Sequence, residues 1–191
     1  APSDLATIDA APALEQYVPA TLVFEGVEHA VSVRYKGGIG AFVGCTANST
    51  PEDLFDTSGA KTCPKLSLKV SFDEVVPDTR FFGVEALQFH AMNADPSLMR
   101  ERLGYQLFRA MGVPAPRAVH ARVIINGELA GLFLNVEVID GRFTRSRFAD
   151  GGGNLYKEVW PTASSMQPPV DTARLLAGLR TNEDESPSVQ R

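Results

Sequence analysis

The sequence lacks the features that mark several protein classes. Only two of its 191 residues are cysteine and one is tryptophan. No apolar run approaches the roughly 18 residues of a membrane-spanning helix. The formal net charge is −5, from 18 Lys and Arg against 23 Asp and Glu, so there is no general excess of cations for sequence-independent binding to nucleic acid or anionic membrane. Hydrophobic residues at 44% and charged residues at 21% are typical of one globular domain rather than of a disordered chain.

The two cysteines stand in a segment that is rich in turn-forming residues. Cys45 and Cys63 flank a run of Thr, Asn, Ser, Gly and Pro, which predicts a loop closed by a disulfide. A disulfide implies an oxidising compartment, whereas the alternative, two free thiols, fits a cytosolic protein. Residues 1–4 (APSD) carry neither an initiator Met nor a signal-type region, and we interpret them as a mature or trimmed terminus. The expected location is secreted or cell surface.

Hydrophobic periodicity predicts strands joined by tight turns and one long helix. Residues 65–72 (KLSLKVSF) alternate strictly, so the apolar side chains should face inward while Lys69 lies on the other face. Asp95 is a typical helix start, Gly112 ends that helix, and its apolar stripe should pack on the sheet. Asn126-Gly127 predicts a hairpin turn. The expected strands are residues 21–25, 28–36, 65–72, 84–89, 118–125, 129–139 and 154–159, and the expected helices are 95–111 and 142–148.

This order of elements predicts an α+β fold, an antiparallel sheet with one major packed helix. Residues 1–19 are expected to be a frayed lead-in and residues 20–160 the domain. Residues 161–191 are expected to form a Pro-containing linker, a short helix and a polar tail.

Common catalytic motifs are absent from the sequence. It contains no G-x-S-x-G, no H-E-x-x-H, no C-x-x-C and no G-x-x-x-x-G-K-[ST]. The histidines His29, His90 and His120 do not have the spacing of metal ligands, so structural or surface roles are expected for them. No catalytic residue and no metal ligand follow from motifs.

Three features occur in the order found in the upper lobe of a protein kinase. In such a lobe a glycine-containing hairpin covers the nucleotide phosphates, a Lys on the third strand contacts them, and a Glu on the next helix orients that Lys. Here Gly37, Gly38 and Gly40 are expected at the hairpin turn, Lys69 on the third strand and Glu101 on the long helix. Each feature also has an ordinary explanation: turn glycines, a solvated lysine and a solvated helix face. The glycine spacing departs from G-x-G-x-x-G at its third position.

A series of short segments between about residues 32 and 157 carries a resemblance to a known family. The segments are residues 33–37 (VRYKG), 65–72 (KLSLKVSF), 95–101 (DPSLMRE), 112–118 (GVPAPRA), 125–128 (INGE), 131–132 (GL), 136–140 (VEVID) and 153–157 (GNLYK). Together, and in this order, they resemble the CotH kinase family, atypical kinase-like proteins first known from spore coats and also found among secreted and surface proteins.

The resemblance implies a kinase-like fold that uses ATP and Mg to phosphorylate Ser on a protein partner. Family members continue beyond the GNLYK segment into a part with a catalytic Asp segment and a metal-binding segment, and this sequence contains neither. The resemblance therefore implies the nucleotide-binding half of a CotH-like kinase, inactive as this chain. By position it implies nucleotide-binding roles for Lys69 (phosphate), Glu101 (partner of Lys69), Tyr156 (adenine platform), Lys157 (phosphate), Gly37 and Gly38.

A second hypothesis belongs to another class: a non-catalytic secreted binding or scaffold module that kept the fold. The expected partners are a protein substrate and either a missing C-terminal lobe or a second copy, docked on an exposed apolar face. No nucleic-acid partner and no membrane span are expected.

Overall fold

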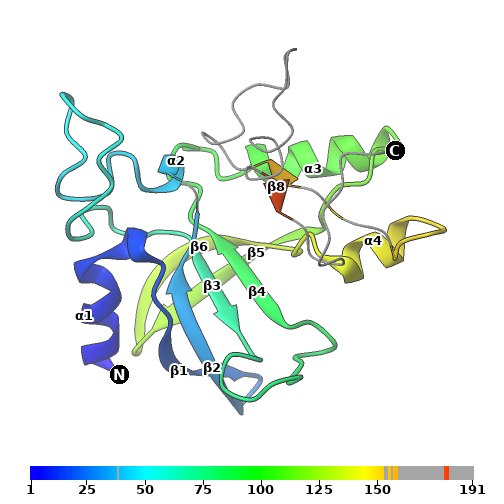
Figure 1. The fold of residues 1–191 in the computed structure, drawn as a ribbon, viewed down its shortest axis with the longest axis horizontal. Helices are drawn as coiled ribbons and strands as arrows, with labels where there is room; N and C mark the ends of the chain where they lie inside the picture. The colour runs from blue at the N-terminus through cyan, green and yellow to red at the C-terminus, as the bar shows by residue number, and fades with distance from the viewer. Residues whose placement is uncertain (38, 153–154, 156, 159–178, 181–191) are drawn as a thin grey trace. The chain divides into compact units, whose positions relative to one another are not determined.

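The computed structural model describes residues 1–37, 39–152, 155, 157–158 and 179–180 of the chain. Backbone contacts divide the chain into two compact units, Ala1–Val138 and Ile139–Arg191. The first unit contains the large sheet and the helices α1, α2 and α3 (Figure 1). No helix among these residues is long and apolar enough to cross a membrane.

The first unit is built on a six-stranded sheet in which every neighbouring pair is antiparallel. The strands run in the order β1-β2-β3-β4-β6-β5. This arrangement confirms the predicted α+β fold with an antiparallel sheet. The strands are β1 Val18–Phe24, β2 Val27–Tyr35, β3 Leu68–Ser71, β4 Ala86–His90, β5 Ala118–Ile125 and β6 Glu128–Val136.

Two hairpins are closed by residue pairs of the form Xaa-Gly. Glu25 and Gly26 join β1 to β2 with φ of 51° and 79°, and Asn126 and Gly127 join β5 to β6 with φ of 51° and 88°. Positive φ at both central residues is the geometry of type I′ turns, whose twist matches that of the strands. The predicted turns are therefore confirmed.

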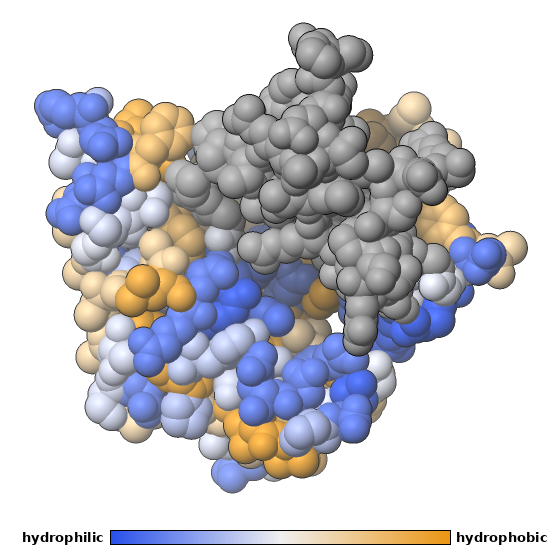
Figure 2. Space-filling model, in the orientation of Figure 1, coloured by the Kyte–Doolittle hydropathy of each residue, from blue (hydrophilic) through white to orange (hydrophobic). Residues whose placement is uncertain are grey.

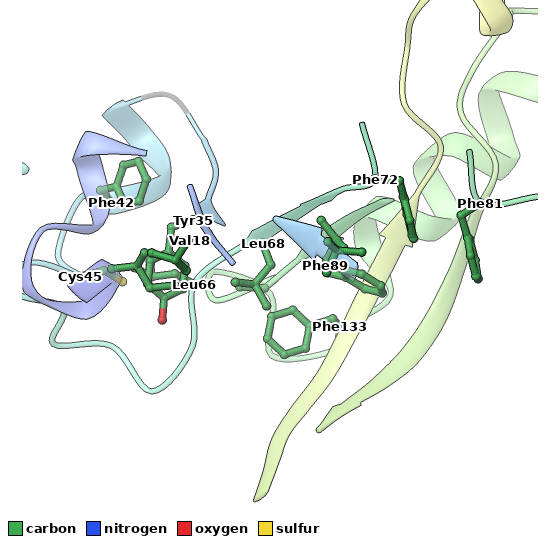
Figure 3. Close-up of a cluster of buried hydrophobic side chains, with 14 residues drawn as sticks. Val18, Tyr35, Phe42, Cys45, Leu66, Leu68, Phe72, Phe81, Phe89 and Phe133 are labelled. Carbon is green, nitrogen blue, oxygen red and sulfur yellow. The ribbon is translucent and has the colours of Figure 1, made fainter. Parts of the chain in front are cut away.

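One face of the sheet packs into an apolar core. The alternation around β3 is confirmed, because Leu66, Leu68, Val70 and Phe72 are all buried. Phe133 of β6 joins them, and Figure 3 shows these side chains gathered in one cluster. Burying a side chain of this size contributes ~1.5–3 kcal/mol, so the alternation of β3 fixes which face points inward.

The first residues of the chain are ordered, which corrects the expectation of a frayed lead-in over residues 1–19. Helix α1 spans Pro2–Ala10, a 3-10 turn spans Pro12–Leu14, and Ile8 is buried in the core. The carboxylate of Asp9 accepts hydrogen bonds from the Tyr35 hydroxyl at 2.6 Å and the Lys61 ammonium at 3.1 Å. These tertiary contacts hold a helix whose own sequence carries no sustained apolar period.

The long loop between β2 and β3 is closed by the predicted disulfide between Cys45 and Cys63. Helix α2, Ile39–Phe42, lies at the start of this loop, and Phe42 and Cys45 belong to the core. The backbone N–H of Thr62 donates to the carbonyl of Cys45 at 2.9 Å. The loop is thus attached to the domain rather than extended into solvent.

Helix α3 spans Arg100–Ala110, so it begins five residues later than residue 95, the predicted start. Residues 95–98 form a turn before it, with Leu98 at φ 54°, and the carboxylate of Asp95 still accepts from the N–H of Arg100 at 2.7 Å. The predicted apolar stripe is not the packed side, because no residue of α3 is buried and Leu103 and Leu107 are exposed.

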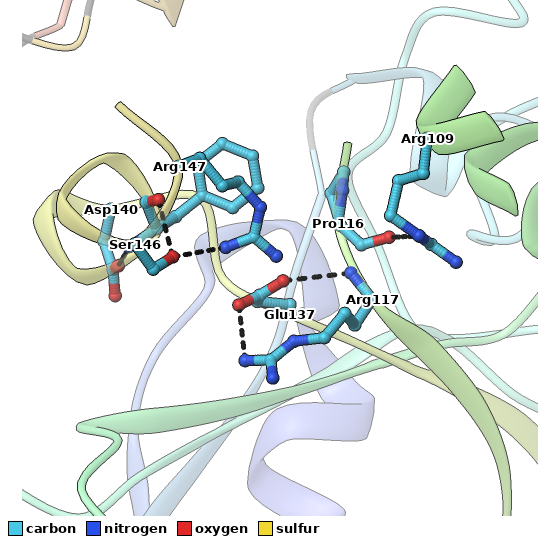
Figure 4. A network of polar contacts seen from close by, with 8 residues as sticks. Arg109, Pro116, Arg117, Glu137, Asp140, Ser146 and Arg147 are labelled. Atoms are coloured by element: carbon cyan, nitrogen blue, oxygen red, sulfur yellow. Dashed lines mark hydrogen bonds and ion pairs between the residues drawn. The ribbon is translucent and has the colours of Figure 1, made fainter. Parts of the chain in front are cut away.

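Polar contacts fix the end of α3 and the outer strands. The guanidinium of Arg109 donates to the carbonyl of Pro116, just before β5. The N–H and the guanidinium of Arg117 donate to the two oxygens of Glu137, at 3.0 and 2.8 Å (Figure 4). These bonds join the start of β5 to the residue after β6.

The described part of the second unit contains one helix and one short strand pair. Helix α4, Gly141–Arg147, is close to the predicted helix over 142–148, and the carboxylate of Asp140 caps it by accepting from the N–H of Phe143 at 3.0 Å. Strand β7, Lys157–Glu158, lies in the predicted strand over 154–159 and pairs with β8, Leu179–Arg180. Apart from β8, the predicted linker, helix and tail of residues 161–191 lie outside the described residues.

Candidate functional site

The face of the sheet opposite the core carries a row of cations. Arg34 of β2 and Lys69 of β3 are direct cross-strand partners, so their side chains project from the same face. Lys36 lies two residues after Arg34 and extends the ladder, since its N–H donates to the carbonyl of Ser67 at 2.9 Å. Side chains two residues apart in a strand share a face. The geometry therefore places Arg34, Lys36 and Lys69 together, and we call them the cation row.

The aromatic ring of Tyr17 lies against two members of the cation row. The Arg34 guanidinium carbon is 5.3 Å from the ring centroid and the Lys69 ammonium is 5.8 Å from it. Both distances lie within the range of cation–π attraction. The hydroxyl of Tyr17 is buried and has no hydrogen-bond partner among the described residues. A buried hydroxyl without a partner is uncommon and leaves an unused donor and acceptor beside the cations.

Glu15 supplies an internal anion to this face. One carboxylate oxygen is 2.6 Å from the Arg34 guanidinium, and the other accepts the N–H of Gly37 at 2.8 Å. Gly37 has φ 145°, and a Cβ at this position would lie 2.1 Å from the Cβ of Ala41. Only glycine fits this backbone, and the nucleotide-binding role predicted for Gly37 stays a prediction.

The second member of the row, Lys36, is held by a chain of hydrogen bonds that reaches α3. Its ammonium lies 3.1 Å from Nε2 of His90, and Nδ1 of His90 lies 2.6 Å from Oε1 of Glu101. The same oxygen accepts the hydroxyl of Tyr105 at 2.8 Å. Because an ammonium group only donates, Nε2 accepts and Nδ1 carries the hydrogen that is donated to Glu101. The network thus assigns one tautomer to His90.

Burial and neighbouring charges shift the pKa of Lys36 in this hydrogen-bond network. Burial lowers the pKa of Lys36, the charges of Arg34 and Lys69 act in the same direction, and Glu101 and Glu15 oppose them. The pKa of Lys36 is thus lowered overall, because burial outweighs the attraction of the two carboxylates.

The pKa values of Glu101 and Tyr105, the two acidic groups in this hydrogen-bond network, shift in opposite directions. Burial by itself raises the pKa of Glu101, but the hydrogen bonds from His90 and Tyr105, with the nearby charge of Lys36, bring the pKa below its usual value. Burial and the hydrogen bond to Glu101 raise the pKa of Tyr105. At neutral pH the site therefore contains an ionised Glu101 carboxylate and a neutral Tyr105 phenol.

The structure differs from the expected pairing of Lys69 with Glu101. Glu101 accepts its hydrogen bond from Nδ1 of His90, and among the described residues no ion pair joins it to Lys69. Helix α3 follows β4 in the chain rather than β3, so its first turn meets the end of β4. The role predicted for Glu101, orienting a lysine, is geometrically available for Lys36 through His90.

Two of the other predicted site residues, Gly38 and Tyr156, lie outside the described residues. Lys157 is described only through its backbone in β7, and β7 belongs to the second unit. The predictions for these three residues stay predictions.

Six residues of the site were not among the predicted site residues: Glu15, Tyr17, Arg34, Lys36, His90 and Tyr105. The alternation of β2 contains a signal for two of them, because Arg34 and Lys36 have the same parity and Lys69 lies opposite Arg34. His90 shares this face. Ser67 lies two residues before Lys69 and so points to the same side, and the register of β3 with β4, continued by one residue, brings Ser67 opposite His90. Tyr17 precedes β1 and gives no periodic signal.

A cavity of about 270 Å³ lies elsewhere, on the core side of the sheet. Apolar side chains line it together with Lys61 and Lys65, and no member of the cation row lines it. Within the described ranges no group of three or more His, Cys, Asp or Glu side chains could hold a metal ion.

Comparison with known proteins decides the family. A family model described as CotH kinase protein matches residues 33–184. The chain belongs to the CotH family. This match includes β2 from Val33 onward, with the whole cation row, and α3 with Glu101.

Two curated CotH relatives come from Bacillus subtilis (strain 168). The inner spore coat protein H-like protein is 38% identical over 73 residues, which cover 38% of this chain and 22% of the relative. The inner spore coat protein H is 36% identical over 88 residues, which cover 46% of this chain and 24% of the relative. The matched segments thus span about a quarter of these relatives.

Proposed function

We propose that this chain is the nucleotide-binding part of a CotH-type protein kinase that transfers phosphate from ATP to Ser on a protein partner. The observation that carries the proposal is the cation row, in which Lys36 is desolvated and held in place by His90 and Glu101. A triphosphate carries several negative charges, and fixed cations with low hydration bind such a group more strongly than mobile surface lysines do.

The residues of this face fit the phosphates of ATP. Arg34 and Lys69 offer donors from neighbouring strands. Bound ATP supplies the phosphoryl group. The described residues contain no acidic cluster for Mg, so no residue is assigned to the metal.

In this proposal, His90 and Glu101 position the ammonium group of Lys36. The carboxylate of Glu101 fixes the Nδ1–H tautomer of His90, and Nε2 then accepts from Lys36. The ammonium group is thereby held at one place while its two other hydrogens stay available for a phosphate. A direct Lys–Glu ion pair does the same work in protein kinases.

The proposed location is a spore coat or cell surface. The two relatives are named as spore coat proteins. The disulfide between Cys45 and Cys63 supports an oxidising environment.

The test is a thermal titration with Mg-ATP. At about 100 times Kd, a ligand that binds only the folded protein stabilises it by ~2.7 kcal/mol. For a domain of this size that raises Tm by roughly 5–10 °C. Lys36→Met and Lys69→Ala should lose most of this rise. Without ATP, Lys36→Met should melt within about 4 °C of the parent, since it removes a desolvated charge.

The matched control is Arg122→Ala, which removes an exposed cation from β5, away from the cation row. It should keep the full ATP response. No rise in the parent protein at millimolar Mg-ATP, or an equal rise in all variants, would contradict the nucleotide site and favour the non-catalytic binding module.

A further inference from the structure

A third Xaa-Gly turn, at Phe82-Gly83, differs from the other two in the residue at its first position. Phe82 and Gly83 have φ of 48° and 82°, close to the values in the turns at Glu25-Gly26 and Asn126-Gly127. The backbones of Phe81 and Val84 close this turn with two hydrogen bonds of 2.8 and 3.0 Å. The first position is polar in the other turns, as type I′ turns prefer, but here it is phenylalanine.

The side chain at this position buries little of its surface on folding. Phe82 is 78% exposed, and positive φ is strained for a bulky residue. Asn at the same position would fit the turn better and would expose less apolar surface. An exposed aromatic ring on a strained backbone indicates a use other than stability.

Phe82 belongs to a group of aromatic side chains beside the end of β1. Its ring packs edge-on against Phe24 at 6.0 Å and Phe81 at 4.8 Å. Apolar surface is visible in Figure 2 near the region where Figure 1 shows the β1–β2 hairpin and the β3–β4 loop. We call Phe24, Phe82 and Val27, the cross-strand partner of Phe24, the aromatic patch; all three side chains are exposed.

The segments that form the patch are strongly acidic. Residues 23–29 and 73–85 contain one arginine, Arg80, which already pairs with Glu85 at 2.8 Å and lies 3.8 Å from Asp78. An apolar centre with a charged rim is the usual design of a specific protein interface. The acidic residues of these segments are Glu25, Glu28, Asp73, Glu74, Asp78 and Glu85.

We propose that the aromatic patch docks a basic segment of a partner protein, with an apolar side chain of that segment against Phe82. The acidic rim selects cations by charge complementarity. It also argues against the other occupants. A second copy docked symmetrically would bring two acidic rims together, and an anionic membrane would be repelled. The patch involves none of the residues of the cation row, so the proposal stands independently of ATP binding.

The experiment measures binding of labelled peptides to the whole chain by fluorescence anisotropy. The probe is a short peptide of alternating Arg and Leu, and the comparison peptides alternate Arg with Ser and Glu with Leu. The Arg-Leu peptide should bind at least roughly tenfold more tightly than either comparison peptide, or ~1.4 kcal/mol. Added salt should weaken its binding, because the rim contributes by charge.

Phe82→Asn is the decisive variant, because it cannot fail through misfolding of the turn. Asn is favoured at this position, so Tm should stay the same or rise, while affinity for the Arg-Leu peptide should fall roughly tenfold. Glu28→Lys with Glu74→Lys should also weaken binding. Ile124→Thr, which changes an exposed apolar residue of β5 outside the patch, should leave affinity unchanged.

Three results would overturn the proposal. The first is equal affinity of Phe82→Asn and the parent for the Arg-Leu peptide. The second is equal binding of the Glu-Leu peptide. The third is concentration-dependent self-association in sedimentation velocity that Phe82→Asn abolishes, which would assign the patch to a second copy of the chain.

Discussion

At the residue scale, the carboxylate of Glu15 takes two contacts that a bound phosphate would use. It accepts the N–H of Gly37 at 2.8 Å and lies 2.6 Å from the guanidinium of Arg34. Glu15 itself has a left-handed backbone, with φ 51°. If ATP binds over the cation row, its phosphates must compete with this internal anion.

Glu15→Gln should therefore tighten Mg-ATP binding. Removing the anion frees Arg34 and lowers the negative potential at the site, so Kd should fall roughly threefold to tenfold, or ~0.7–1.4 kcal/mol. Isothermal titration calorimetry measures this change. Glu25→Gln, which neutralises an exposed carboxylate in the β1–β2 turn, is the control and should leave Kd unchanged. Weaker ATP binding by Glu15→Gln would show that Glu15 organises the site instead of competing for it.

The residue scale also marks the limit of sequence reasoning. The side of the sheet that Lys69 occupies could be predicted, because strand alternation is a local property. The partner of Glu101 could not, since it depends on which strand lies beneath the first turn of α3. That contact joins His90 to Glu101 across a turn with a left-handed Leu98, which periodicity does not reveal.

At the element scale, the β2–β3 loop behaves as part of the domain. The disulfide closes it, a backbone bridge joins Thr46 to Lys61, and Phe42 lies in the core. Turn-forming residues and the two cysteines predicted the loop and its closure. The burial of Phe42 and the order of α1 could not be predicted, because both arise from contacts between segments far apart in the chain.

Removal of the disulfide should destabilise the domain without changing its fold. The chain-entropy estimate for a loop of this length is ~3 kcal/mol, which lowers Tm by roughly 6–12 °C. The Cys45→Ala, Cys63→Ala double variant should show this drop in a thermal melt, and a reducing agent should produce the same drop in the parent. The double variant should be insensitive to the reducing agent. An unchanged Tm in the double variant would contradict a structural role for the bridge.

At the scale of the whole molecule, a modest net charge of −5 hides a separation of charge within the first unit. Acidic residues predominate in the β1–β2 hairpin and the β3–β4 loop, the segments that carry the aromatic patch, whereas Arg34, Lys36 and Lys69 share one face of the sheet. Composition reports only the sum. The separation follows from strand order, which the sequence alone does not specify.

The division of backbone contacts predicts that residues 1–138 fold on their own. This fragment contains all six strands, the disulfide and α3, so it should melt cooperatively with Tm within about 4 °C of the whole chain. Circular dichroism with a thermal melt tests this. A broad, non-cooperative transition would show that residues after 138 are needed for the core.

The hydrogen bonds of Asp9 link α1 to segments that are synthesised later. Its partners Tyr35 and Lys61 lie 26 and 52 residues further along the chain. During synthesis α1 is made before the strand that ends at Tyr35 and the loop that carries Lys61, so these two contacts of Asp9 form only after both segments have followed. A chaperone that protects the nascent chain would therefore meet α1 before the contacts of Asp9 with Tyr35 and Lys61 have formed.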